Sequence, residues 1–370
     1  MFRLMEHKDY TVIHQGTEVT RKILDNLNSP DDRLKIIHIA GTNGKGSTAE
    51  YFTRILIASG KKAGTFTSPA VYDFYDQFRI DGEVFPAAEK YFKKAETAAA
   101  GLNATDFEIQ TAGILLAFCE EGCEYAVIEC GMGGLYDATN AVNKKVLAVI
   151  TSISLEHTAY LGGTVEEICA HKAGIIKNCP AVVNAYQPAE ARKYFEKLGV
   201  IFAEASGGVQ SFNAATAVVG ARLLGIDENC IARGIENARL SGRMQEFNAE
   251  GIKYILDGAH NPAAFVPLSN FLKGLAGEKI IIFGCLADKD IEGNLSALAG
   301  ICDKIIAVKC NSPRARSSEQ TAEACKKYFK TVQTAESVSD ALNFAFAKTV
   351  VVCGSFTLLR EAKEWIGKKR

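Results

Sequence analysis

Short apolar runs alternate with longer amphipathic segments through the first half of the chain. The runs have the length and composition of buried strands, and they span residues 34–40, 125–130, 146–150 and 181–184. The segments between them carry apolar residues at helical spacing, and they span residues 47–59, 107–119 and 165–176. This alternation of strand and helix predicts a mostly parallel sheet covered by helices.

The second half opens with two helical segments and then repeats the alternation. The helical segments span residues 212–224 and 230–238, and the strand-like runs that follow span residues 252–256, 279–283, 304–308 and 349–353. We therefore expect an α/β protein of two domains. A P-loop-type domain with a mostly parallel sheet is predicted for residues 1–243, and a smaller Rossmann-like α/β domain for residues 244–370.

Length and charge narrow the class of protein. A chain of 370 residues is too long for one ordinary core and suits two domains. The formal net charge of −1 shows no basic excess, so nucleic acid is not an expected partner. Segment Met1–Tyr10 is charged and lacks the apolar core of a signal peptide. No apolar run approaches the ~20 residues of a membrane helix. We expect a cytoplasmic monomer that acts on small molecules, without a membrane partner.

The 11 cysteines are scattered through apolar segments. Their number is odd and no CxxC pair occurs, so disulfides and a zinc site are both disfavoured. We expect buried free thiols, as is usual in a reducing compartment.

The clearest local signal is a Gly-rich loop between the first predicted strand and helix, with the sequence Gly41-Thr42-Asn43-Gly44-Lys45-Gly46-Ser47. Glycines let the backbone wrap around phosphate oxygens, and the helix that follows directs its N–H groups at them. We expect Lys45 to contact the β- and γ-phosphates and Ser47 to place a hydroxyl near Mg²⁺. Gly46 separates these two residues, so the common P-loop pattern is not met. The alternative is a Gly-rich turn with an exposed lysine.

Other polar groups follow predicted strands. Glu129 ends one strand, where a carboxylate can hold Mg²⁺ bound to ATP, and Asp257 follows a strand of the second half. His157 and Lys172 come after the strand at 146–150. By themselves these residues have ordinary alternatives: a solvated carboxylate, a polar turn, a hydrogen-bonded structural histidine and a solvated lysine.

Taken together, these residues resemble the folylpolyglutamate synthase/dihydrofolate synthase family, of the bifunctional bacterial type, within the Mur-ligase superfamily. The resemblance runs in matching order from about Gly16 to Glu364. The matching segments are HIAGTNGKGS (38–47), TSP (67–69), FRIDGE (78–83), DFE (106–108), GMGG and DATN (within 131–140), ISLEHTAYLG (153–162), HKAGIIK (171–177), SGRMQ (241–245), DGAHNP (257–262), LADKD (286–290), NSPRA (311–315) and CGSF (353–356).

The resemblance implies an ATP-dependent ligase that adds L-glutamate to dihydropteroate, tetrahydrofolate or both, with ATP and two Mg²⁺ ions. It implies that Gly41–Ser47 bind the ATP phosphates and that Lys45, Lys172 and His157 act in catalysis. Lys172 matches a lysine that family members carbamylate. The implied metal ligands are Ser47, Ser68, Glu129, His157 and Lys172.

The resemblance also implies contacts with the nucleotide and with the pterin side of the acceptor. The implied nucleotide contacts, beyond the loop, are Asn213, Arg243, Asp257 and His260. The implied substrate contacts are Thr105, Asp106, Phe107, Glu108, Tyr136, Asp137 and Ala138.

Several positions depart from the family pattern. Leu135 stands where the family usually has Arg, and Ala70 where it has His; Glu156 replaces an Asp. The changes concentrate where the acceptor and glutamate bind, so ATP use is better supported than the identity of the substrate. Leu135 and Ala70 motivate one alternative, a non-catalytic or altered-substrate ATP-binding paralogue. A second alternative is a Mur-type cell-wall ligase, against which the DGAHNP segment argues.

Overall fold

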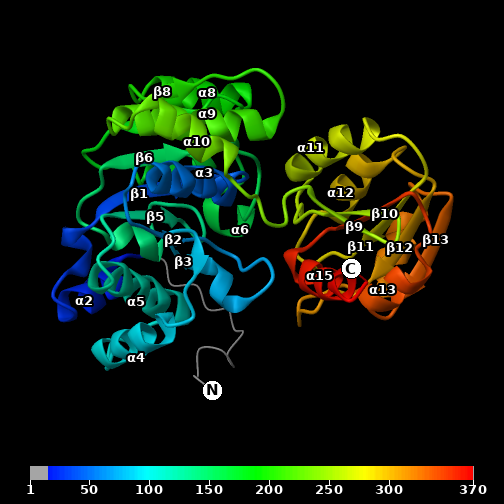
Figure 1. Cartoon of the computed structure of the whole chain (residues 1–370), viewed down its shortest axis with the longest axis horizontal. Helices are drawn as coiled ribbons and strands as arrows, with labels where there is room; N and C mark the ends of the chain where they lie inside the picture. The colour runs from blue at the N-terminus through cyan, green and yellow to red at the C-terminus, as the bar shows by residue number, and fades with distance from the viewer. Residues whose placement is uncertain (1–15, 370) are drawn as a thin grey trace. The chain divides into compact units, whose positions relative to one another are not determined.

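The computed structural model describes residues 16–369, so segment Met1–Tyr10 lies outside the described residues. The chain divides into two compact units (Figure 1). The first unit contains the residues up to Pro69 and Phe74–Arg239, and the second contains Ala70–Asp73 and the chain from Leu240 onward. The second unit thus begins slightly before the predicted boundary at 243/244, and it includes a short segment from the first half of the sequence.

Within the described residues, the first unit holds an eight-stranded sheet in the order β4-β3-β2-β5-β1-β6-β7-β8. All neighbours from β2 to β8 pair in parallel, whereas β3 and β4 add an antiparallel edge. The strands are β1 (Lys35–Ala40), β2 (Ala63–Phe66), β3 (Phe78–Ile80), β4 (Glu83–Val84), β5 (Tyr125–Glu129), β6 (Leu147–Ile150), β7 (Ala181–Asn184) and β8 (Ile201–Ala203). The expected parallel sheet is confirmed.

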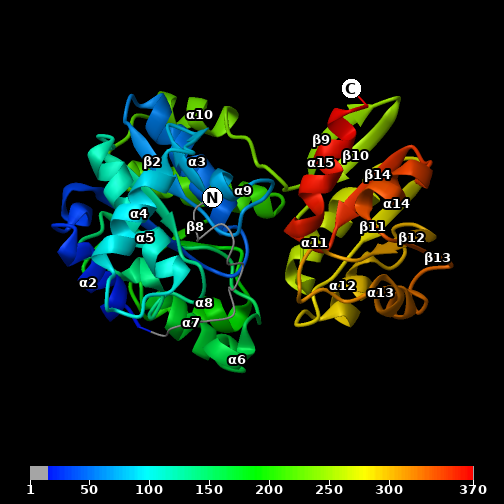
Figure 2. The ribbon, with the colours of Figure 1, turned by 90° about the horizontal axis from the view of Figure 1, so that it is seen from below.

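Helices cover both faces of this sheet (Figures 1 and 2). On one face lie α3 (Lys45–Ala58), α9 (Val209–Leu223) and α10 (Glu228–Glu236). The other face packs against α2 (Glu18–Asn26), α4 (Ala88–Ala98), α5 (Asp106–Glu120), α7 (Val165–Ala173) and α8 (Ala189–Glu196). The short helix α6 (Thr158–Leu161) precedes α7. Successive side chains of the central strands point to opposite faces of the sheet. Both sets are buried, as is typical of a parallel sheet covered by helices.

The second unit is a six-stranded sheet within the described part of the chain, in the order β13-β12-β11-β14-β10-β9. Its strands are β9 (Gln245–Ala249), β10 (Ile252–Leu256), β11 (Lys279–Phe283), β12 (Lys304–Val308), β13 (Thr331–Ala335) and β14 (Thr349–Cys353). Only β9 pairs antiparallel. One face packs on α11 (Pro262–Lys273), α12 (Ile291–Leu298) and α13 (Ser318–Cys325), and the other on α14 (Val338–Phe344) and α15 (Leu359–Gly367).

Residues 70–73 pack within the second unit although they precede most of the first. Val71 and Tyr72 join the apolar cluster that includes Leu359 of α15. The Tyr72 hydroxyl donates a hydrogen bond to the Gln245 Oε1 of β9. The ammonium of Lys363 lies 3.9 Å from the centroid of the Tyr72 ring, a cation–π contact. The chain therefore passes between the units three times, at Pro69/Ala70, Asp73/Phe74 and Arg239/Leu240.

Each of the 11 cysteines is described and has a free thiol, as expected; seven of them are buried, whereas Cys119, Cys179, Cys230 and Cys302 are half-buried. Burial raises the pKa of several of them, for example that of Cys123 to about 12. Among residues 16–369, no helix is long and apolar enough to cross a membrane.

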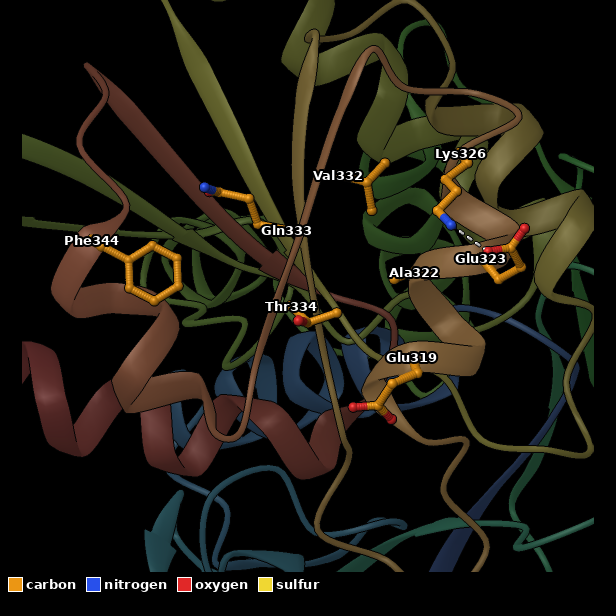
Figure 3. Close-up of a pocket in the computed structure, with 8 residues that line it drawn as sticks. All are labelled: Glu319, Ala322, Glu323, Lys326, Val332, Gln333, Thr334 and Phe344. Atoms are coloured by element: carbon orange, nitrogen blue, oxygen red, sulfur yellow. Dashed lines mark hydrogen bonds and ion pairs between the residues drawn. The ribbon is translucent and has the colours of Figure 1, made fainter.

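A surface hollow of about 550 Å³ lies beside β13, the edge strand of the second sheet (Figure 3). It is lined by Glu319, Ala322, Glu323, Lys326, Val332, Gln333, Thr334 and Phe344. Glu323 of α13 forms an ion pair with Lys326, the residue that follows the helix. The predicted site residues do not line this hollow.

The packing of Gly64 gives a test of the first core. A Cβ at Gly64 of β2 would lie 2.3 Å from the ring of the buried Phe118. Gly64→Ala should therefore destabilise the protein by about 1–3 kcal/mol through overpacking. Gly163→Ala is the control, because a Cβ there meets no described atom within 4 Å; its effect should stay within about 0.5 kcal/mol. Urea unfolding measures both, and equal midpoints would contradict the packing argument.

Candidate active site

The Gly-rich loop connects β1 to α3 by a path that excludes side chains at two positions. Gly41 has φ 148° and Gly44 has φ 90°. A Cβ at Gly41 would lie 1.8 Å from Thr151 Oγ1, and one at Gly44 would lie 2.5 Å from Asn213 Oδ1. The last three residues of this segment, Lys45–Ser47, begin α3, so the unpaired N–H groups of a helix N-terminus belong to the loop.

The loop is tied to the segment that follows β6. The Thr42 and Asn43 amides donate to the Ser152 carbonyl, at 2.8 and 3.3 Å. The Thr42 hydroxyl donates to the Ser154 carbonyl and accepts from the Ser154 amide, each at 3.1 Å. These bonds fix the backbone of the loop before any ligand binds.

Several predicted residues meet at the carboxyl ends of neighbouring strands. Glu129 ends β5 and is only 4% exposed. Its Oε1 lies 3.7 Å from the Lys45 Nζ, and its Oε2 accepts a hydrogen bond of 3.2 Å from the Ser68 amide. A lysine, a carboxylate and a helix N-terminus are thus brought together at one edge of the sheet, as the sequence predicts.

Ser47 supplies the observation that points to a ligand. Its side chain is 2% exposed, and its hydroxyl has no hydrogen-bond partner among the described residues. A buried hydroxyl without a partner is costly unless a ligand satisfies it. Ser47 lies two residues after Lys45 on α3, and a Cβ at the intervening Gly46 would lie 3.4 Å from Glu129 Oε2. Hydroxyl and carboxylate oxygens of this kind fit Mg²⁺.

Lys172 is buried at the same edge. Its side chain is 3% exposed, and its Nζ donates a hydrogen bond of 2.7 Å to the Gly41 carbonyl. Burial and the neighbouring Lys45 ammonium lower the pKa of Lys172 to about 7. The ordinary alternative, a solvated lysine on a helix face, is therefore excluded.

His157 lies in the segment that follows β6. It has a left-handed backbone, φ 52°, at the start of α6. Its Nε2 is 4.0 Å from the Glu156 Oε1, and its side chain is exposed. Within the described chain, no three His, Cys, Asp or Glu side chains form a metal cluster. The predicted metal set has only Glu129 and His157 of these types, so its remaining ligands would be hydroxyls and a modified lysine.

Asn213 of α9 contacts the loop directly. It is buried against Gly44, accepts a hydrogen bond of 3.1 Å from Asn184 Nδ2, and donates one of 3.2 Å to Gln210 Oε1. Asn184 ends β7 and was not singled out from the sequence. The sequence signal that could have identified Asn184 is its position as a polar residue at the end of an apolar strand.

Three predicted nucleotide contacts form a group in the second unit. Asp257 is buried after β10 and accepts bonds from the Met244 and Ala259 amides, at 2.7 and 2.8 Å. Burial raises the pKa of Asp257 despite the opposing charge of Arg243. The Arg243 guanidinium lies 4.6 Å from the Phe356 ring centroid, and the His260 ring lies 6.0 Å from the same ring.

The predicted substrate contacts at the start of α5 have a structural role as well. Thr105 and Glu108 form a capping box, in which the Thr105 amide donates to Glu108 Oε2 at 2.7 Å and the Glu108 amide to Thr105 Oγ1 at 3.3 Å. Asp106 is the first residue of the helix. The Phe107 ring packs against Gly131 and lies 5.8 Å from the Phe66 ring.

The second predicted group of substrate contacts, residues 136–138, contains both exposed and buried side chains. The Tyr136 side chain is exposed, with its ring 5.7 Å from that of His171. Asp137 is buried and accepts bonds from the Met132 amide, at 2.7 Å, and from Thr139. Ala138 is buried too. Asp137 therefore shapes this segment, and substrate contact by Asp137 or Ala138 stays a prediction.

Comparisons with known proteins agree with this geometry. Residues 39–221 match the Mur ligase middle domain, and residues 242–356 match the Mur ligase, glutamate ligase domain. The dihydrofolate synthase/folylpolyglutamate synthase of Escherichia coli is 33% identical over 374 residues, covering 90% of this chain and 87% of that protein. The chain belongs to the dihydrofolate synthase/folylpolyglutamate synthase family.

Solved structures of this family have the same fold. The Escherichia coli enzyme in complex with DHPP and ADP has a TM-score of 0.89 and 30% identity, covering 99% of this chain and 96% of that one. A bifunctional family member with Mn, AMPPNP and L-glutamate bound has a TM-score of 0.87 and 29% identity, covering 97% of this chain and 96% of that one. Members of this family are ATP-dependent ligases. The family match and these structures confirm the resemblance inferred from the sequence.

Two left-handed glycines at the ends of one helix give a matched test of the loop. Gly44 and Gly60 have φ 90° and 75°, but only Gly44 has neighbours where a Cβ would lie. Alanine at either position costs about 1–2 kcal/mol of backbone strain. Gly44→Ala should in addition weaken ADP binding about tenfold or more, because it moves the loop from Asn213. Calorimetric titration compares the two variants, and equal affinities would contradict the role of the loop.

Proposed function

We propose that this chain is an ATP-dependent carboxylate–amine ligase that joins the carboxylate of dihydropteroate, tetrahydrofolate or both to the amino group of L-glutamate. The observation that carries the proposal is the group formed by Lys45, Ser47, Glu129 and Lys172 around the Gly-rich loop, in a chain of this family. Its chemistry fits phosphoryl transfer from ATP to an acceptor carboxylate.

The proposed reaction has two steps. A carboxylate oxygen of the acceptor attacks the γ-phosphorus of ATP, the bond to the β–γ bridging oxygen breaks, and ADP leaves. The glutamate amine then attacks the acyl carbon, phosphate leaves, and the nitrogen loses a proton. The first step needs positioning and charge more than a protein nucleophile. Lys45 supplies a positive charge beside the loop, and the loop amides and the α3 N-terminus hold the phosphate oxygens.

Ser47, Ser68, Glu129, His157 and a carbamylated Lys172 are the proposed ligands of two Mg²⁺ ions. The ions, when bound, supply positive charge to the phosphate oxygens. Two observations support this set: the buried Ser47 hydroxyl that lacks a protein partner in the described chain, and the position of Glu129 against Lys45 and the Ser68 amide.

The environment of Lys172 supports the carbamate. A pKa of about 7 leaves much of the amine neutral near neutral pH, and the neutral amine is the form that attacks CO₂. The new C–N bond releases a proton and gives an anion. A carbamate beside Lys45 replaces the repulsion between two ammonium groups by attraction, and it offers the oxygen ligands that Mg²⁺ prefers.

The other predicted site residues are proposed to bind the nucleotide or the acceptor. Asn213, Arg243, Asp257 and His260 contact the nucleotide, and the segments 105–108 and 136–138 contact the acceptor. Leu135 and Ala70 distinguish this chain from the family pattern on the substrate side, so the acceptor is the part most open to change. The protein is proposed to act as a cytoplasmic monomer.

The direct test is ATP turnover with defined acceptors. We expect ADP formation that requires both L-glutamate and either dihydropteroate or tetrahydrofolate, with a product one glutamate heavier by mass spectrometry. Turnover with a UDP-sugar acceptor instead would identify a cell-wall ligase. ATP binding without turnover on any acceptor would identify the non-catalytic paralogue.

Lys45→Ala should lower kcat about 10²–10³-fold, because one electrostatic contact in the transition state is lost. The fold should be kept, since Lys45 contributes charge and packs little of the core. Lys61→Ala is the control, since Lys61 lies just beyond the C-terminal end of α3 and pairs with the half-buried Glu124. Steady-state kinetics at saturating ATP separates the two, and wild-type turnover by Lys45→Ala would refute the assigned role.

Lys172→Ala should lose most activity and recover part of it in the presence of short-chain carboxylic acids. The acids replace the carbamate oxygens in the space that the side chain leaves. Lys177→Ala, which removes an ammonium five residues along the chain that is bonded to the Asn140 carbonyl, should show no such rescue. Full activity of Lys172→Ala without added acid would mean that no carbamate is required.

A further inference from the structure

A buried carboxylate on α3 binds residues near two of the three places where the chain crosses between the units. This carboxylate belongs to Glu50, which is 3% exposed. Strand β3 begins four residues after the chain re-enters the first unit at Phe74, and Arg239 is the last residue before it leaves again. Glu50 binds both.

The contacts of Glu50 use both carboxylate oxygens. Its Oε2 accepts a hydrogen bond of 2.6 Å from Arg79 of β3. Its Oε1 accepts one of 2.7 Å from Arg54, one turn further along α3, and one of 3.3 Å from the Arg239 amide. Burial by itself raises the pKa of Glu50, but Arg79 and Arg54 together hold the pKa below its usual range. The group is therefore a buried carboxylate that stays ionised between two guanidinium groups.

The backbone that leads to Arg239 is held against the same helix. Helix α10 packs so closely on α3 that a Cβ at Gly234 would lie 2.4 Å from the Ile55 Cα. After α10 ends at Glu236, the Arg239 guanidinium donates to the Glu236 and Ala238 carbonyls, at 3.3 and 3.1 Å. The segment is thus held to α3 at Gly234 and at the Arg239 amide, and the second unit begins at the next residue.

We propose that Glu50 is a positioning residue of the ligase reaction, which ties the Arg239/Leu240 junction, and strand β3 that follows the Asp73/Phe74 junction, to the helix that begins at Lys45. This inference rests on the proposed function. Because α3 carries Lys45 and Ser47 in its first turn, the Glu50 contacts make the junctions and the phosphate loop parts of one rigid element. The chain that leads into the second unit is then held to the same helix that carries the phosphate site.

The charge of Glu50 is essential to this role. Glutamine at position 50 keeps the shape and one acceptor oxygen, but it leaves Arg54 and Arg79 without a buried counter-charge. Loss of one partner from a buried ion pair is strongly destabilising where it occurs. Because the Glu50 contacts join α3 to β3 and Arg239, we expect Glu50→Gln to loosen the attachment of β3 and Arg239 to α3.

The test compares Glu50→Gln with Asp31→Asn. Asp31 is a matched control, since it is a buried carboxylate bonded to Arg21, at 2.8 Å, and to the Asn143 amide, at 3.1 Å, and it contacts neither junction. The readouts are the rate of tryptic cleavage after Arg239 under native conditions, the Kd for ADP, and kcat and KM for ATP.

For Glu50→Gln we expect cleavage after Arg239 to be about tenfold faster, because local opening governs the cleavage rate. We expect kcat to fall about tenfold while the Kd for ADP changes less than about twofold, because the loop itself stays intact. Asp31→Asn should lower the unfolding midpoint in urea without either effect. Arg79→Gln, which frees only β3, should give a smaller loss of kcat and serves as the second variant if Glu50→Gln does not fold.

Equal cleavage rates and equal kcat in the Glu50→Gln and Asp31→Asn proteins would overturn the proposal. So would an unchanged kcat in a folded Arg79→Gln protein. The proteolysis readout does not require turnover. If the wild-type protein has no ligase activity, the proposed function fails, whereas faster cleavage after Arg239 still measures the release of the junction.

Discussion

Close passage of the phosphate loop past Thr151 and Asn213 is the constraint on which the rest of the site depends. Side chains at Gly41 and Gly44 cannot fit, so the loop backbone lies directly against the segment after β6 and the α9 face. That approach places the Gly41 carbonyl within reach of Lys172 and starts α3 beside Glu129. The charges of the site are therefore arranged by backbone geometry, and side-chain packing from other helices maintains it.

The sequence predicted best those elements that local pattern determines. Strands at 252–256, 279–283, 304–308 and 349–353 were predicted at their observed bounds, because each is a continuous run of largely apolar residues bounded by polar ones. Edge strand β13 was missed, since Thr331–Ala335 is mostly polar and mostly exposed and lacks the apolar run of a central strand. The antiparallel β9 was missed for the same reason.

The site shows the same division. The phosphate loop and Glu129 could be identified from strand-end chemistry, because the carboxyl ends of parallel strands converge. Lys172 could not, because a lysine on a helix looks solvated until the tertiary fold buries it; only the resemblance to a family singled it out. Neither local sequence pattern nor the family resemblance predicted the Glu50 contacts. They join residues 50, 79 and 239, whose proximity no local pattern encodes.

Residues 70–73 have a consequence for the way this protein is synthesised. The segment leaves the ribosome long before the sheet on which Val71 and Tyr72 pack, because that sheet begins only at Gln245. The second unit cannot complete its core until most of the chain has emerged, and it must then capture a segment that the nascent first unit already flanks. A fragment from Leu240 onward, expressed alone, would lack the Val71 and Tyr72 side chains and expose the apolar surface around Leu359. The two units are distinct in packing, yet they are not independent as translation products.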